Sequence, residues 1–233
     1  MNQNLSIAAI LIGFSICFFA CTPKSKKVEN PEECKTLEPK DSASFKHIKY
    51  FFYKGNDGCL YEKKFIIDKF DSNYCKMAYY DKYINPMDSL PTPLDSIIDI
   101  NSFVQIDSTG YSKDNKNVYY YQDNTDGGMR YITVANSSSF VKLHDYRWGR
   151  DNKHIFHKGV AVIGLDANSC ILMPEHDSDG NESFVDYVKD TRHVFYDCDS
   201  VMGADPETFK VVNDRLWDAQ DKNHKYQYGK RLD

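Results

Sequence analysis

The chain has 233 residues, of which 41% are hydrophobic and 14% aromatic, and its formal net charge is −5. This apolar content is enough for one or two packed domains and excludes a disordered chain, while only 12 glycines and 8 prolines exclude collagen-like sequence. With 29 basic against 34 acidic residues there is no basic field to hold a phosphate backbone, so we expect no nucleic-acid partner.

The N-terminal region carries a charge-free apolar run from Leu5 to Ala20, followed by Cys21 and a polar stretch. A bilayer-spanning helix needs about 20 residues, so the run is typical of a secretory signal peptide over residues 1–20. Apolar residues shortly before a small residue and a cysteine resemble the bacterial lipoprotein signal. This resemblance implies cleavage before Cys21 and attachment of lipid, including a palmitoyl chain, to Cys21. The alternative interpretation is an uncleaved N-terminal membrane anchor.

Residues 21–43 are rich in lysine, glutamate and proline, which predicts a flexible tether after the lipidated cysteine. We therefore expect a lipid-anchored protein of the bacterial cell envelope, and the absence of an acidic cluster directly after Cys21 favours the periplasm over the cell surface. Setting aside Cys17 and Cys21 leaves an odd number of cysteines, whose pairing the spacing does not fix: Cys34, Cys59, Cys75, Cys170 and Cys198.

Residues 99–233 contain four copies of one pattern, in which an aspartate is followed three residues later by Asn or His and five residues later by an aromatic residue. The aspartates are Asp114, Asp151, Asp190 and Asp221, and the aromatic residues are Tyr119, Phe156, Phe195 and Tyr226. A second motif precedes each copy and ends in Phe103, Phe140, Cys170 or Phe209.

Each copy predicts a β-hairpin. An aspartate at the first turn position accepts a hydrogen bond from its own backbone two residues on, so we assign the four aspartates a structural role in the turns. Asn or His three residues later tolerates the positive φ of a bulged turn. Because strand side chains alternate between faces, the aromatic residue five positions on is expected in the core, as are the phenylalanines of the second motif.

Residues 44–98 contain further strand-like runs and are interpreted as an N-terminal β segment that is compatible with a diverged repeat. The sequence thus predicts an all-β fold of tandem antiparallel β-hairpin repeats that form a curved, solenoid-like sheet. A closed propeller-like or barrel arrangement is the alternative.

Three segments carry a family resemblance: residues 114–120 (DNKNVYY), 190–196 (DTRHVFY) and 203–209 (GADPETF). They resemble the DKNYY family, repeat proteins of the bacterial envelope, over about residues 99–233. The resemblance implies an architecture and no assigned activity, so it transfers no catalytic residue. Lys225 stands where the other repeats have an apolar residue, which is consistent with a polar terminal repeat.

One acidic loop has the ligand spacing of a calcium site. Asp177, Asp179 and Asp186 fall at calcium-ligand positions of an EF-hand-like loop, but its first ligand position is a glutamate, its last is the short Asp186, and no helix flanks it. The histidines at 154, 193 and 224 share the turn position of Asn117, so a turn role explains them without a metal. We therefore expect no metal site and no cofactor.

No nucleophile elbow, P-loop or dinucleotide-binding motif occurs in the sequence, so we expect no enzyme. The surplus of tyrosines, including Tyr120, Tyr121, Tyr196 and Tyr228, is compatible either with an exposed binding face or with additional packing. We expect a non-catalytic module that binds an unknown protein or glycan. The alternatives are a periplasmic immunity protein against a basic toxin and a hydrolase whose site is built from loops.

Overall fold

The computed structural model describes residues 42–70, 73–84, 90–106, 110–124, 127–143, 147–174, 186–212 and 216–232. These residues belong to one compact unit, Cys34–Asp233. The predicted signal peptide, Cys21 and Cys34 lie outside the described residues, as do Asp177 and Asp179. Within the described residues no helix is long and apolar enough to cross a membrane.

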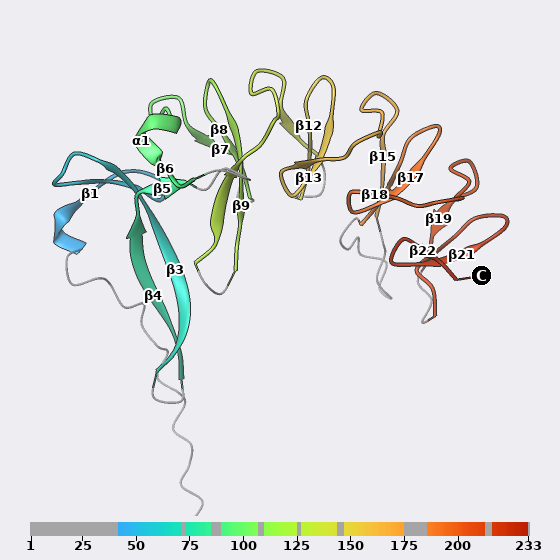
Figure 1. Ribbon diagram of the computed structural model, residues 1–233, viewed down its shortest axis with the longest axis horizontal. Helices are drawn as coiled ribbons and strands as arrows, with labels where there is room; N and C mark the ends of the chain where they lie inside the picture. Colours follow the sequence, from blue (N-terminus) through green and yellow to red (C-terminus); the bar gives the residue numbers. More distant parts are fainter. Residues whose placement is uncertain are drawn as a thin grey trace, which may run out of the picture. The chain divides into compact units, whose positions relative to one another are not determined.

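The N-terminal β segment forms a four-stranded antiparallel meander in the order β1-β2-β3-β4 (Figure 1). Its strands are β1 (Phe45–Lys49), β2 (Phe52–Gly55), β3 (Leu60–Phe70) and β4 (Asn73–Asp81), after a short 3₁₀ turn η1 (Ser42–Ser44). A two-stranded pair, β5 (Tyr83–Ile84) with β6 (Thr92–Pro93), and the single-turn helix α1 (Leu94–Ile97) connect this sheet to the repeats.

Each of the four repeats forms its own four-stranded antiparallel sheet, and the sheets follow in chain order (Figure 1). Repeat 1 contains β7 (Val104–Gln105), β8 (Tyr111–Lys113), β9 (Val118–Gln122) and β10 (Met129–Ile132); repeat 2 contains β11 (Val141–Lys142), β12 (Trp148–Arg150), β13 (Ile155–His157) and β14 (Val160–Ala161). Repeat 3 contains β15 (Ile171–Met173), β16 (Tyr187–Lys189), β17 (Val194–Tyr196) and β18 (Asp199–Ser200); repeat 4 contains β19 (Lys210–Val211), β20 (Ala219–Gln220), β21 (Lys225–Gln227) and β22 (Lys230–Arg231). The predicted all-β class and tandem antiparallel hairpins are confirmed, and no sheet in the described part of the chain closes into a barrel.

The core is divided among the junctions between consecutive sheets. One cluster joins the N-terminal sheet to repeat 1, and three more join repeats 1 and 2, 2 and 3, and 3 and 4. The predicted core residues lie in these clusters or against them, each at most 3% exposed: Tyr119, Phe156, Phe195, Tyr226, Phe103, Phe140 and Phe209. Stability of such an array is a sum of nearest-neighbour contacts, because each repeat buries apolar surface mainly against the next.

The prediction of a positive φ at Asn117 and at the histidines that share its position is wrong. Among the described residues, positive φ outside glycine occurs at Tyr50, Lys158, Asp197 and Tyr228, and not at Asn117 or the histidines that share its position. The left-handed residues lie instead in the second turn of the repeats, where Lys158-Gly159 and Tyr228-Gly229 form two-residue hairpin loops with positive φ at both positions. A two-residue loop whose residues both have positive φ joins the strands without disturbing their right-handed twist, and these loops therefore adopt that conformation.

Candidate functional site

The four repeat aspartates tie two turns together in the same way. One carboxylate oxygen of Asp190 accepts the N–H groups of Arg192 and His193, both at 2.7 Å, and the other accepts the N–H of Asp166 at 2.9 Å. The same three bonds recur at Asp114, Asp151 and Asp221. Each carboxylate thus closes its own hairpin turn and holds the turn of the second motif against it.

These bonds explain the acid–base properties of the aspartates. Burial alone would raise the pKa of Asp221, but the N–H groups of Asp205, Asn223 and His224 and the Tyr226 hydroxyl outweigh it and lower the pKa to about 2. The same balance of burial against backbone N–H groups lowers the pKa of Asp151 and Asp190. The structure places the four carboxylates in the hairpin turns of four separate sheets, and none lines either of the cavities described below. Their contacts are those of structural turn residues.

The other residues singled out in the sequence are distributed over several places. Asp186 is the described member of the candidate calcium loop, and its Oδ1 is 2.8 Å from the Arg147 guanidinium. His154 and His193 are half exposed, with Nδ1 3.6 Å from the aspartate that opens their own turn. Cys59, Cys170 and Cys198 are free thiols, and burial raises the pKa of Cys170 to about 11. Of the four tyrosines considered for an outer face, Tyr228 is 66% exposed, Tyr121 and Tyr196 are half-buried, and Tyr120 is buried.

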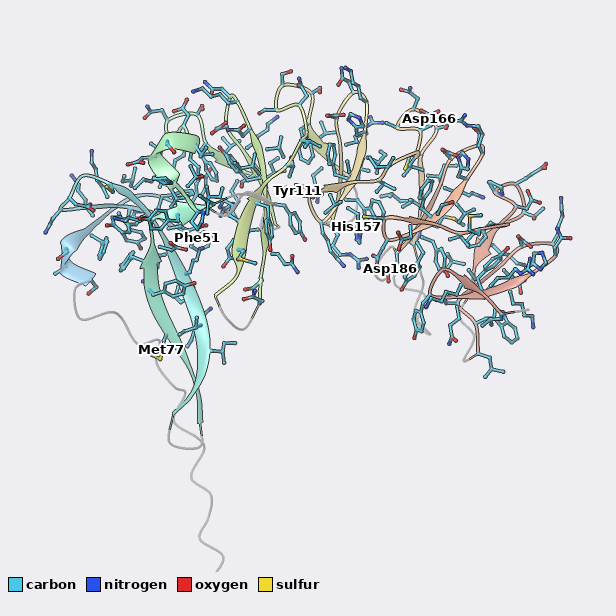
Figure 2. All side chains as sticks on the ribbon, in the orientation of Figure 1. Phe51, Met77, Tyr111, His157, Asp166 and Asp186 are labelled. Carbon is cyan, nitrogen blue, oxygen red and sulfur yellow. The ribbon has the colours of Figure 1, made fainter. Side chains whose placement is uncertain are left out.

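A groove of about 1030 Å³ lies between the N-terminal sheet and repeats 1 and 2. Aromatic rings from both sides line it, including Phe51 and Tyr111, which Figure 2 labels. Tyr50, Phe51 and Ile67 are 43%, 45% and 51% exposed and belong to this one lining, so the groove presents neighbouring apolar side chains to solvent. The full lining is Tyr50, Phe51, Phe52, Glu62, Lys63, Phe65, Ile67, Lys76, Phe103, Gln105, Gly110, Tyr111, Ser112, Tyr120, Tyr121, Gln122, Asp123, Asn124, Arg130, Arg147 and Lys158.

The groove is basic although the chain as a whole is acidic. Five lysines and arginines line it against two acidic residues. Beyond the Arg130–Glu62 pair and the Arg147–Asp186 pair, the lining still carries three lysines against Asp123. Lys76 Nζ lies 4.4 Å from the ring centroid of Phe65, which places a cation beside exposed apolar surface. A partner that presents both acidic and apolar groups would complement this surface.

A buried ion pair forms the base of the groove. The Arg130 guanidinium donates to Glu62 Oε1 at 2.5 and 3.1 Å and to the Ser112 hydroxyl at 2.7 Å, and the side chains of Arg130 and Glu62 are 7% and 2% exposed. Its carbon Cζ lies 5.3–5.7 Å from the ring centroids of Tyr121, Phe52 and Phe103. Arg130 therefore joins the N-terminal sheet to repeat 1, which fixes the two walls of the groove relative to each other.

Glu62 and Arg130 are not among the residues that the sequence pattern predicts for a site. A usable signal existed in β3, where Leu60, Glu62 and Lys64 share one face and all three are buried. Charged residues on the same face as a core leucine indicate buried partners. The partner of Glu62 lies 68 residues away, however, and pattern analysis within one strand does not locate it.

Comparison with known proteins assigns the repeats to a family. The family model of the DKNYY family matches residues 96–230, which is more than half of the chain and covers all four repeats. No curated protein and no solved structure matches the chain. The chain belongs to the DKNYY family.

Proposed function

We propose that this protein is a non-catalytic, lipid-anchored binding module of the bacterial cell envelope, and that its basic aromatic groove binds an acidic, apolar segment of a partner protein. The observation that carries the proposal is the combination of exposed Phe51 and Ile67 with a groove lining of five basic and two acidic residues. Charge complementarity of this kind gives specificity, and the exposed rings supply the contact area of a binding site.

A protein partner is favoured over a glycan by the apolar part of the lining. Phe51, Phe65 and Ile67 carry no hydrogen-bonding group and match apolar side chains of a peptide, which a glycan does not offer. The immunity-protein alternative rests on the net charge of −5, but the groove has the opposite sign and would repel a basic toxin. The hydrolase alternative needs two converging carboxylates, and Glu62 is already bound by a guanidinium.

Site-specific photo-crosslinking in intact envelopes tests the groove. A benzophenone amino acid at Phe51 is expected to capture a protein through an acidic segment, identified by mass spectrometry of the crosslinked peptide. The matched control is the same probe at Ile163, which is 79% exposed and does not line the groove. Lys63→Glu with Lys76→Glu should abolish the Phe51 adduct, whereas Lys116→Glu with Lys153→Glu, in the repeat turns, should leave it unchanged.

Three results would overturn the groove assignment: no protein adduct at Phe51, the same adducts at Ile163, or an adduct that survives reversal of the groove charges. Binding to a glycan array without any protein adduct would replace the protein partner by a glycan.

The anchor is tested separately. Cys21→Ala is expected to move the chain from the membrane fraction to the soluble fraction, and mass spectrometry of the wild-type chain should show an acylated N-terminal Cys21. Unchanged membrane partition of the variant would contradict lipidation at this residue.

A further inference from the structure

Two of the three junctions between repeats are closed by the same contact, which we call the tyrosine latch. The hydroxyl of Tyr111 in repeat 1 accepts the N–H of Gly159 in the second turn of repeat 2 at 3.0 Å. The hydroxyl of Tyr187 in repeat 3 accepts the N–H of Gly229 in repeat 4 at 2.8 Å. In both cases a second tyrosine ring packs edge-on to the first, with centroids 4.8 and 4.9 Å apart.

At the junction between repeats 2 and 3, other residues occupy both the ring positions and the turn positions of this latch. Trp148 stands in place of the latch tyrosine, and an indole has no oxygen to accept a hydrogen bond. His157 replaces the second tyrosine and stacks on Trp148 at 4.2 Å with an interplanar angle of 25°. The facing turn is Asp197-Cys198 instead of a residue followed by glycine. Three of these four replacements introduce residue types that ligate metal ions.

The replaced positions converge in space with Asp186. His157 is 2% exposed, and its Nδ1 lies 3.2 Å from Asp197 Oδ1. One ligand atom from each of His157, Asp186 and Asp197 lies within 4.8 Å of the other two. Figure 2 shows His157 and Asp186 lying near each other, although His157 belongs to repeat 2 and both aspartates to repeat 3.

We propose that His157, Asp186 and Asp197 bind a divalent transition-metal ion, with Zn²⁺ as the best-matched ion, and that the ion takes the place of the tyrosine latch. One imidazole nitrogen and two carboxylate oxygens are a ligand set that Zn²⁺ accepts, and a buried imidazole disfavours Ca²⁺, which takes oxygen ligands. Ligand atoms that lie about 2.0–2.2 Å from a tetrahedral Zn²⁺ are about 3.4 Å apart. The 3.2 Å between His157 Nδ1 and Asp197 Oδ1 matches this spacing, and the wider separations within the group, up to 4.8 Å, must shorten on binding.

Charge and access are consistent with this site. The two carboxylates of Asp186 and Asp197 lie beside the imidazole of His157, and a bound cation would offset their negative charge together with the Arg147 guanidinium, which lies 2.8 Å from Asp186 Oδ1. A second cavity of about 430 Å³ is lined by His157, Asp197 and Cys198, and provides a route from solvent. Because the ligands come from two repeats, binding cross-links the junction and must raise its stability.

The test uses the full chain, purified in detergent without a histidine tag. Titration with ZnCl₂ by calorimetry is expected to show one tight site per chain, and the Tm should rise with Zn²⁺ concentration. Asp197→Asn, which changes one atom of a half-exposed side chain, should lower the Zn²⁺ affinity at least tenfold and remove the Tm rise. His157→Gln should do the same.

The matched controls are Asp199→Asn, two residues away in the same hairpin, and His154→Gln, a half-exposed histidine three residues before the site. Both should bind Zn²⁺ as the wild type does. The absence of a tight Zn²⁺ site in the wild type would overturn the proposal, as would an equal loss of affinity in the controls. Preference for CaCl₂ over ZnCl₂ in parallel titrations would overturn the role of His157.

Discussion

The carboxylate of Asp190 accepts the backbone N–H of Asp166 at 2.9 Å, across 24 residues of sequence. This bond joins the turn that opens repeat 3 to the hairpin turn at its centre. Asp114, Asp151 and Asp221 make the corresponding bond in the other three repeats. The aspartate of the repeat motif is therefore a long-range structural element as well as a local turn residue.

Replacing Asp190 by alanine should lower the free energy of unfolding by about 2–4 kcal/mol, because three backbone N–H groups lose a charged acceptor at a position that is 3% exposed. Urea denaturation followed by circular dichroism measures the change. The control is Asp199→Ala, an exposed aspartate for which less than about 0.5 kcal/mol is expected. Equal losses in the two variants would contradict the structural role of Asp190.

Stability should fall in acid because of Asp221. Its pKa in the folded protein, about 2, is below the ordinary value of 3.8, so the folded state favours the carboxylate. The resulting stabilisation is complete above about pH 4 and is lost as the pH falls toward 2. The difference in Tm between the wild type and Asp221→Asn should therefore be largest near pH 6 and shrink toward pH 2. A difference that grows on acidification would have the wrong sign.

Removing one tyrosine latch should loosen one junction. In Tyr187→Phe the N–H of Gly229 loses its acceptor and Asp218 loses a donor at 2.8 Å, so the free energy of unfolding should fall by about 1–2 kcal/mol. Amide hydrogen exchange at Gly229 should accelerate in the variant. Tyr228→Phe, at a side chain that is 66% exposed, is the control and should change neither quantity.

The Glu62–Arg130 pair should behave as a buried ion pair. Arg130→Met leaves Glu62 uncompensated and should cost about 3–5 kcal/mol, whereas Glu62→Leu combined with Arg130→Met should recover much of that loss. A double-mutant cycle in urea gives the coupling energy. Lys222→Met breaks the solvent-exposed pair with Asp205 and should cost far less stability than Arg130→Met, because solvent screens exposed charges. If the Arg130 and Lys222 variants lost the same stability, the tie between the N-terminal sheet and repeat 1 would be refuted.

Repetition in the sequence carried most of the fold prediction. Four aspartates at equivalent positions, each followed by an inward aromatic residue, were sufficient to predict hairpins, their turns and core residues such as Tyr119 and Phe156. This succeeded because Asx turns and the alternation of side chains along a strand are local properties, fixed by residues within one repeat. The positive φ positions were misplaced because two turns per repeat compete for that assignment, and the pairing of strands decides between them.

The sequence by itself was sufficient to predict the all-β class and the tandem antiparallel hairpins, because the repeated turn motif is visible without any tertiary contact. Only the tertiary structure decided which residues of different repeats meet: Glu62 with Arg130 at the base of the groove, and His157 with Asp197 at the junction of repeats 2 and 3. The physical reason is that turn and strand preferences act over a few residues, whereas a groove or a shared ligand cluster arises where separate sheets pack. The partner of a buried charge is set by that packing and not by its neighbours in sequence.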